Sequence, residues 1–239
     1  MVAPKGTGDM ENTEVRTLPV EDTSIVACGT LRHEIDRLAA EGLLDADRVL
    51  YTGPGLHERP AELESQLMRQ LGKVCGDSVR VVVAYGHKCF LDVGDPSRDT
   101  DALIRQACPY AVRAGADNCV DMLAGREERD RLAAGAKVYW LTPGWLRHWD
   151  TIFKDWDAAK ANETFPQHDK AIVLDGIGFF DRFLTAEPER LLAISDWMRL
   201  PIEAAPVSLD RLRDLLVEAA GRPDVGGGLG VSQRLPRRR

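Results

Sequence analysis

The sequence lacks any apolar run close to the ~20 residues that a membrane-spanning helix needs. Its first residues also lack a basic segment followed by an apolar core, so we expect neither a signal peptide nor a membrane span. The five cysteines are too few, too scattered and odd in number for a disulfide framework. We therefore predict a cytoplasmic protein whose cysteines stay reduced.

Several common catalytic motifs are also missing, including GxSxG, HExxH and the P-loop. The segment DGIGFFD at 175–181 has only two glycines and no ribose-binding acid in register, so we expect no dinucleotide site. A net charge of −7 argues against a nucleic-acid surface, although four of the last six residues are arginines. We interpret that basic end as a solvated appendage rather than a binding domain.

The composition fits one large α/β domain. The chain has 239 residues, of which 44% are hydrophobic and 29% are charged. Residues 1–22 are polar and without periodicity, which predicts a disordered extension, and residues 221–239 predict a flexible tail rich in glycine and arginine. Between them, residues 23–220 are expected to form a single α/β domain.

Short β-like runs alternate with amphipathic helical stretches through this domain. Strands are expected at 24–28, 47–52, 79–85, 110–114, 137–141, 170–175 and 201–205. Helices are expected at about 31–42, 60–73, 98–107, 119–134, 144–159, 187–199 and 208–220. The pattern predicts a Rossmann-like fold, with a mostly parallel sheet flanked by helices and the site at the C-terminal edge of its strands.

Three cysteines, Cys28, Cys89 and Cys119, each follow an apolar run that predicts a strand. Loops that follow parallel strands converge on one edge of the sheet, so three thiolates could meet there. Thiolates select zinc, Cu(I) or an iron–sulfur cluster, and three protein ligands leave a fourth position open. No CxxC spacing supports the set, and a buried cysteine also often serves as a small hydrophobic residue.

Two further titratable residues are candidates for catalysis. His57 follows the second expected strand in YTGPGLHERP, where it is a fourth ligand, a general acid or base, or a surface histidine. Glu34 lies six residues after Cys28 on the next helix, where it either approaches the crevice or faces solvent. His87, two residues before Cys89, is a weaker candidate ligand.

A metal-free mechanism is the competing hypothesis. Asp117 and Asn118 are expected to cap the helix that begins at Cys119, and a helix N-terminus depresses the pKa of a thiol. The two other cysteines, Cys75 and Cys108, are interpreted as packing residues. The aromatic segment 139–149 is interpreted as core or as an interface, which makes a homo-oligomer plausible.

Four short motifs occur in order: ACGTL at 27–31, LHERP at 56–60, YGHKC at 85–89 and DNC at 117–119. Over about residues 24–218 the chain thereby resembles an uncharacterised prokaryotic family of domain-of-unknown-function proteins. That family carries ACGAL, LHNRP, YGLCG or YADCG, and HDC or PHC in this order. The chain departs from the pattern at Phe90, where the family has glycine, and at Asn118, where it often has an acid or a histidine.

The resemblance implies that Cys28, Cys89 and Cys119 act together, with His57 nearby. Family members are often encoded beside corrinoid-dependent methyltransferase components, which implies a role in methyl transfer or one-carbon metabolism and a corrinoid protein or methyltransferase as partner. We thus expect a zinc or [4Fe–4S] protein that acts on a small molecule, with the three cysteines as metal ligands and His57 and Glu34 as catalytic residues. A shell that includes His57 would favour zinc, and a cysteine-only shell would favour the cluster. A non-catalytic metal-binding partner protein and a metal-free cysteine enzyme are the alternatives.

Overall fold

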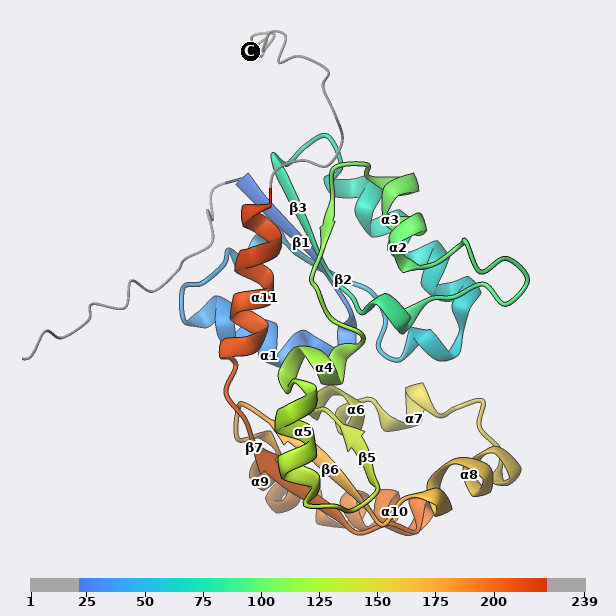
Figure 1. Ribbon diagram of the computed structural model, residues 1–239. Helices are drawn as coiled ribbons and strands as arrows, with labels where there is room; N and C mark the ends of the chain where they lie inside the picture. Colours follow the sequence, from blue (N-terminus) through green and yellow to red (C-terminus); the bar gives the residue numbers. More distant parts are fainter. Residues whose placement is uncertain (1–21, 223–239) are drawn as a thin grey trace, which may run out of the picture.

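A computed structural model describes residues 22–222, and these form an α/β protein with two parallel sheets (Figure 1). The first sheet has the order β2-β1-β3-β4, from β1 (Thr23–Ala27), β2 (Val49–Tyr51), β3 (Arg80–Ala84) and β4 (Val112–Arg113). The second has the order β5-β6-β7, from β5 (Val138–Leu141), β6 (Lys170–Asp175) and β7 (Ile202–Pro206). The expected α/β class is confirmed, and the strands divide between two sheets because β5 pairs with β6 instead of β4.

The first sheet is covered by helices on both faces. Ile25 and Ala27 of β1 face α1 (Arg32–Ala40) and α11 (Asp210–Gly221), whereas Val26 and Cys28 face α2 (Pro60–Val74) and α3 (Thr100–Ala107). Successive side chains of a strand point to opposite faces, so a run such as TSIVA, buried at every position, predicts a strand covered on both sides. We call this sheet with its helices the first lobe.

The second lobe is built on β5–β7 and holds an aromatic core. Its helices are α6 (Pro143–Arg147), α7 (Trp149–Ile152), α8 (Ala158–Thr164), α9 (Phe179–Ala186) and α10 (Pro188–Met198). Trp145, Trp149, Phe153 and Phe165 pack together beneath the sheet. Trp145 and Trp149 are only 7% and 5% exposed. For these two residues, the prediction that the aromatic segment belongs to the core is therefore confirmed.

Two long helices expected from the sequence are broken. The stretch 119–134 forms α4 (Cys119–Leu123) and α5 (Arg126–Ala133), because Ala124 between them adopts an extended conformation. The stretch 144–159 contains α6, α7 and the beginning of α8. Helix α9 was not expected, because it begins inside the glycine-containing segment DGIGFFD. Short 3-10 turns complete the described chain: η2 (Gly29–Leu31), η3 (Ala46–Arg48), η4 (Leu56–Glu58), η5 (His87–Cys89) and η6 (Phe165–Gln167).

The C-terminal edges of the two sheets face each other. Gly144 at the start of α6 lies against the backbone of Thr30, just after β1. On the other side, the His33 ring of α1 lies 5.5 Å from the Phe179 ring, just after β6. Figure 1 shows the first lobe above the second, with α4 and α6 between the sheets. The loop that follows β1 thus lies where the two lobes pack against each other.

The predicted extension and tail lie outside the described residues, apart from Asp22, Gly221 and Arg222. Within residues 22–222, no helix combines the length and apolar character that a membrane crossing requires.

Candidate metal centre

The three predicted metal ligands lie at the ends of adjacent first-lobe elements. Ala27 of β1 is in register with Ala84 of β3, and the N–H of Cys28 donates to the Ala84 carbonyl at 3.3 Å. Cys89 ends the short turn η5 after β3, and Cys119 is the first residue of α4 after β4. The parallel topology therefore carries three cysteines, distant in sequence, to the same edge of the sheet.

A glycine allows the Cys89 loop to approach the Cys119 loop. A Cβ at Gly86 would lie 2.2 Å from the carbonyl oxygen of Asp117 and 2.3 Å from the Cα of Asn118, closer than any side chain permits. The N–H of Lys88 donates to that same Asp117 carbonyl at 2.9 Å. The two loops are thus held backbone to backbone, and their cysteines are brought together.

The thiols are close enough to affect one another's protonation. Burial raises the pKa of the Cys89 thiol, and the neighbouring thiols of Cys28 and Cys119 raise it further. Burial likewise raises the pKa of Cys119 to about 12, and Cys28 adds to the shift. Three mutually repelling thiolates become stable together only when a cation binds them.

The raised pKa of Cys119 contradicts the expectation that a helix N-terminus lowers the pKa of this thiol. Asn118 does cap α4, because its side chain accepts a hydrogen bond from the N–H of Asp121 at 2.9 Å. The pKa of Cys119 is nevertheless raised, since burial and the nearby Cys28 outweigh the field of a helix of only five residues. The prediction that the pKa of Cys119 is depressed was therefore wrong. The hypothesis of a metal-free nucleophile rested mainly on that prediction.

The spacing of the sulfurs bears on the metal. Among residues 22–222, the one group of three ligand atoms that all lie within 4.8 Å of one another is His87, Asp99 and Asp101. At least one pair of the Sγ atoms of Cys28, Cys89 and Cys119 therefore lies more than 4.8 Å apart. A tetrahedral zinc with Zn–S bonds of about 2.3 Å holds its sulfurs about 3.8 Å apart. In an iron–sulfur cluster each thiolate binds a different iron, which suits a wider spacing.

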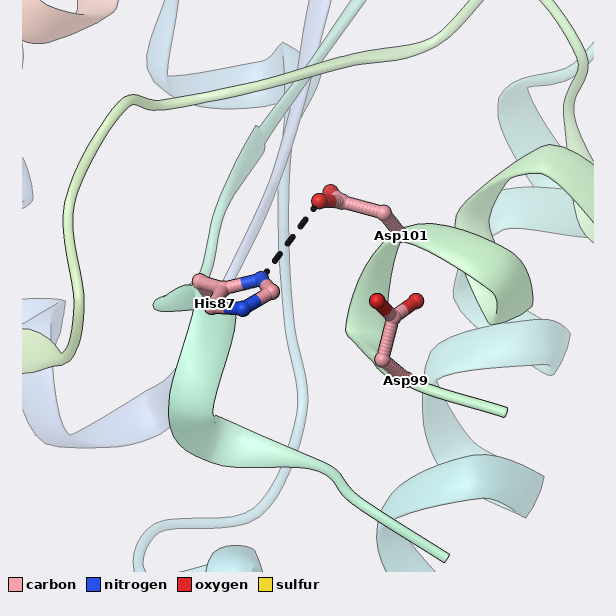
Figure 2. Close-up of side chains that lie close together, drawn as sticks. All are labelled: His87, Asp99 and Asp101. Atoms are coloured by element: carbon pink, nitrogen blue, oxygen red, sulfur yellow. Dashed lines mark ion pairs between the residues drawn. The ribbon is translucent and has the colours of Figure 1, made fainter. Parts of the chain in front are cut away.

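Figure 2 shows the side chains of His87, Asp99 and Asp101. Both carboxylates of this group accept hydrogen bonds from other residues. Asp99 caps α3 by accepting from the N–H of Ala102 at 2.7 Å, and Asp101 accepts from Arg113 Nε at 2.6 Å. His87 Nδ1 points at Asp101, 3.6 Å away. Because the carboxylates already have partners, we interpret the group as an ion-pair network that anchors the turn before Cys89.

Glu34 carries a buried carboxyl group that has no hydrogen-bond partner among the described residues. Its side chain is fully buried, with 0% exposure, and neither carboxylate oxygen has a hydrogen-bond partner among the described residues. Burial raises its pKa to about 8, with a further contribution from the negative charge of Asp175 in the second lobe. Glu34 is also near enough to Cys119 to raise the pKa of that thiol. The solvent-facing alternative is excluded, and a neutral, unpartnered carboxyl lies beside the cysteines.

His57 lies at the edge of the site. Its ring contacts Trp145, with 5.3 Å between ring centroids, and its Nε2 is 3.6 Å from Glu58. Glu58 in turn accepts from Trp156 Nε1 at 3.0 Å and from Lys160 Nζ at 2.7 Å, both in the second lobe. Burial lowers the pKa of His57 despite Glu58. The imidazole is thus directed at a carboxylate that joins the lobes.

Sequence analysis missed the polar groups that surround the thiols. Cys28 and Thr30 share a hydrogen bond of 3.0 Å, and the hydroxyls of Thr52 and Tyr85 share another. The pKa of Tyr85 is raised by burial and by the nearby thiols of Cys28 and Cys89. Tyr85 precedes Gly86 in the YGHKC motif. Its position between the expected strand and Cys89 could have indicated that its hydroxyl lies near the thiols.

The remaining cysteines lie away from this edge. Cys75 follows α2 and Cys108 follows α3, before the strands β3 and β4 begin, so both pack near the opposite edge of the sheet in the same core cluster as Cys28. Burial raises the pKa of Cys108 to about 12, and the neighbouring Cys75 thiol contributes. Their expected role in packing is confirmed.

Together, the fold and the site define a two-lobed α/β protein in which three cysteine-bearing loops meet at the edge of the first sheet that faces the second lobe. The chain belongs to the family described as "Protein of unknown function (DUF1638)", which matches residues 51–216. This confirms the expected membership in an uncharacterised domain-of-unknown-function family. The match includes Cys89 and Cys119 and begins after Cys28.

Other comparisons add little. No protein of curated function matches the chain. A solved structure of a conserved domain protein from Vibrio cholerae O1 biovar El Tor strain N16961 is 12% identical. The similarity covers 83% of this chain and 82% of that one, with a TM-score of 0.31. A similarity this low supports no argument about fold or function.

Proposed function

We propose that this protein binds a [4Fe–4S] cluster through Cys28, Cys89 and Cys119 and acts with it on a small molecule. The observation that carries the proposal is the convergence of three cysteine-bearing loops at one edge of the sheet, where Cys28 hydrogen-bonds to Ala84 and Gly86 lets the Cys89 loop lie against the Cys119 loop. The three Sγ atoms do not all lie within 4.8 Å of one another, and the His57 imidazole faces Glu58, so we favour a cluster over a single zinc. A cluster held by three thiolates leaves one iron without a protein ligand, and that iron supplies a binding position for a substrate.

The buried groups around the thiols support a site rather than a packed core. Glu34 in the first lobe and Trp145 in the second both carry buried polar atoms without partners among the described residues. Such groups cost folding free energy unless something binds to them. Their unused hydrogen-bonding capacity is therefore available to a bound molecule.

The Glu34 carboxyl is suited to proton transfer. With a pKa of about 8 it is mostly protonated at neutral pH, so it can donate a proton to a bound molecule and take it back. Its burial excludes water, which would otherwise compete for that proton. We therefore assign the general acid role to Glu34 and a supporting role in proton transfer to His57.

The reaction class rests on the family resemblance alone. We propose a step in methyl transfer or one-carbon metabolism, with a corrinoid protein or methyltransferase as partner. Saturable binding of the metal-loaded protein to a purified corrinoid protein would support this. Saturable binding without turnover would favour the non-catalytic alternative, and lack of binding would remove the corrinoid partner without affecting the metal site.

The test of the metal centre is analysis of iron, zinc and acid-labile sulfide in protein purified without oxygen. The wild type is compared with C28A, C89A and C119A, and with C75A and C108A as matched controls near the opposite edge of the sheet. We expect about four irons with sulfide in the wild type and both controls, and their loss in each of the three site variants. About one zinc lost in the same three variants would replace the cluster with zinc, and a metal-free wild type would overturn the proposal.

A further inference from the structure

Thr30 brings a buried hydroxyl group to the sulfur of a proposed metal ligand. Its Oγ1 lies 3.0 Å from Cys28 Sγ, and the two atoms share a hydrogen bond in which either can be the donor. Both residues are buried, with exposed fractions of 1% for Thr30 and 7% for Cys28. Water therefore has little access to this contact, and the hydroxyl lies directly beside the sulfur.

The turn that carries Thr30 is fixed from within the first lobe. The N–H of Leu31 donates to the Cys28 carbonyl at 3.0 Å and closes the turn η2 directly after β1. A Cβ at Gly29 would lie 2.5 Å from the carbonyl oxygen of Thr52, in the loop that follows β2. Only glycine permits this approach, so the turn packs against the backbone of that loop. Because Thr30 and Cys28 lie in the same fixed turn, the hydroxyl stays beside the sulfur.

The second lobe fixes the same turn from the other side. A Cβ at Gly144 would lie 2.1 Å from the carbonyl oxygen of Thr30, so glycine is needed where α6 reaches the turn. The hydroxyl of Thr142 donates to that same oxygen at 3.4 Å. Thr30 thus contacts the second lobe through its main chain and Cys28 through its side chain. A donor that is already in place costs no reorganisation when negative charge develops on its acceptor.

Metal binding decides which of the two groups donates. A thiol that binds a metal has lost its proton, so Cys28 can then only accept, and the Thr30 hydroxyl is the donor. Hydrogen bonds to a charged acceptor are about twice as strong as those between neutral groups. Donors directed at ligand sulfurs stabilise the more negative, reduced state of a cluster and thereby raise its reduction potential.

We propose that Thr30 is a positioning residue that donates an O–H···S hydrogen bond to the Cys28 thiolate when the metal is bound. The inference rests on the proposed function and deepens it, because it names a group that orients one ligand sulfur and tunes the metal centre. Serine carries the same hydroxyl as threonine, whereas valine has nearly the same shape as threonine and lacks it.

The test compares T30V, which removes the hydroxyl, with T30S, which keeps it. T142V is the matched control, because Thr142 is a fully buried threonine at the same contact between the lobes and its hydroxyl donates to the Thr30 carbonyl. The measurements are the iron content, the midpoint reduction potential and the thiolate-to-metal charge-transfer absorption of proteins loaded without oxygen. If the wild type binds zinc, the same absorption is measured after replacement of zinc with Co²⁺. If valine prevents folding, T30A takes its place, since T30A and T30S differ only in the hydroxyl group.

We expect T30V to take up metal as the wild type does, to have a lower reduction potential, and to absorb at longer wavelength in the charge-transfer band. T30S and T142V should keep the wild-type band and potential. A loaded T30V protein whose band and potential equal those of the wild type would overturn this inference and leave the metal centre intact. A shift of equal size in T142V would also overturn it, because the effect would then come from packing between the lobes. A wild type that takes up neither iron nor Co²⁺ would instead overturn the proposed function and, with it, this inference.

Discussion

Replacement of Glu34 by glutamine should make the metal-free protein more stable. The carboxyl has an ordinary pKa of 4.5 when exposed and about 8 in the folded protein, because burial disfavours its charged form. Unfolding therefore releases a proton at neutral pH. A group with a raised folded-state pKa contributes its full stability below pH 4.5 and loses it as the pH rises through 8. Glutamine resembles the protonated carboxyl in shape and has no such dependence.

The magnitude follows from the two pKa values. One pKa unit corresponds to about 1.4 kcal/mol, so the wild type loses about 3 kcal/mol between pH 4.5 and pH 7 through this group. Above pH 8 the loss levels off at about 5 kcal/mol. E34Q should therefore exceed the wild type in unfolding free energy by an amount that grows with pH and then becomes constant.

The assay is urea denaturation of chelator-treated protein at pH values from 5 to 9. The control is E127Q, which removes an exposed carboxylate from α5 and should show no comparable change with pH. A stability difference between E34Q and the wild type that does not change with pH would refute the reasoning. It would mean that the Glu34 carboxylate is ionised throughout and has a partner. Stabilisation with loss of function would be the trade-off typical of active sites.

Two further substitutions probe the loops that form the site. G86A places a Cβ against the Asp117 carbonyl, and we expect a loss of about 1–3 kcal/mol in chemical denaturation together with loss of bound metal; a fully stable, metal-loaded variant would show that this close approach is not needed. E58Q weakens the contact with Lys160 and should cost about 0.5–1 kcal/mol, an amount that shrinks in high salt because the pair is partly exposed. It should also lower the pKa of His57 further, since Glu58 is the group that raises it, and an NMR titration in which that pKa rises would contradict the contact.

Much of the first lobe could be predicted from the sequence. All seven strands occur near their expected positions, because runs such as RVVVA combine β-branched residues with burial at nearly every position. The placement of Cys28, Cys89 and Cys119 followed from the same pattern. Once the strands are parallel, the loops that follow them share an edge.

The division into two sheets could not be predicted in this way. Alternation of strands and helices in a sequence does not specify which strands pair with one another. Tertiary packing decides whether β5 pairs with β4 or with β6, and in this protein it pairs with β6. The contact between the lobes was hidden for the same reason. The sequence around Gly144 indicates an aromatic core, and only the structure shows that Gly144 lies against the backbone of Thr30.

The return of α11 to the first lobe affects how the protein is made. Leu212, Leu216 and Ala219 of this helix pack against Ile25 and Ala27 of β1, although almost the whole chain separates them. A ribosome must therefore synthesise the entire second lobe before the first sheet can be covered on both faces. The cysteine loops of the nascent chain stay on an unfinished scaffold until then. Insertion of the proposed metal is consequently expected to follow synthesis of α11, and a protein that ends after β7 would present three cysteines without the helix that completes their lobe.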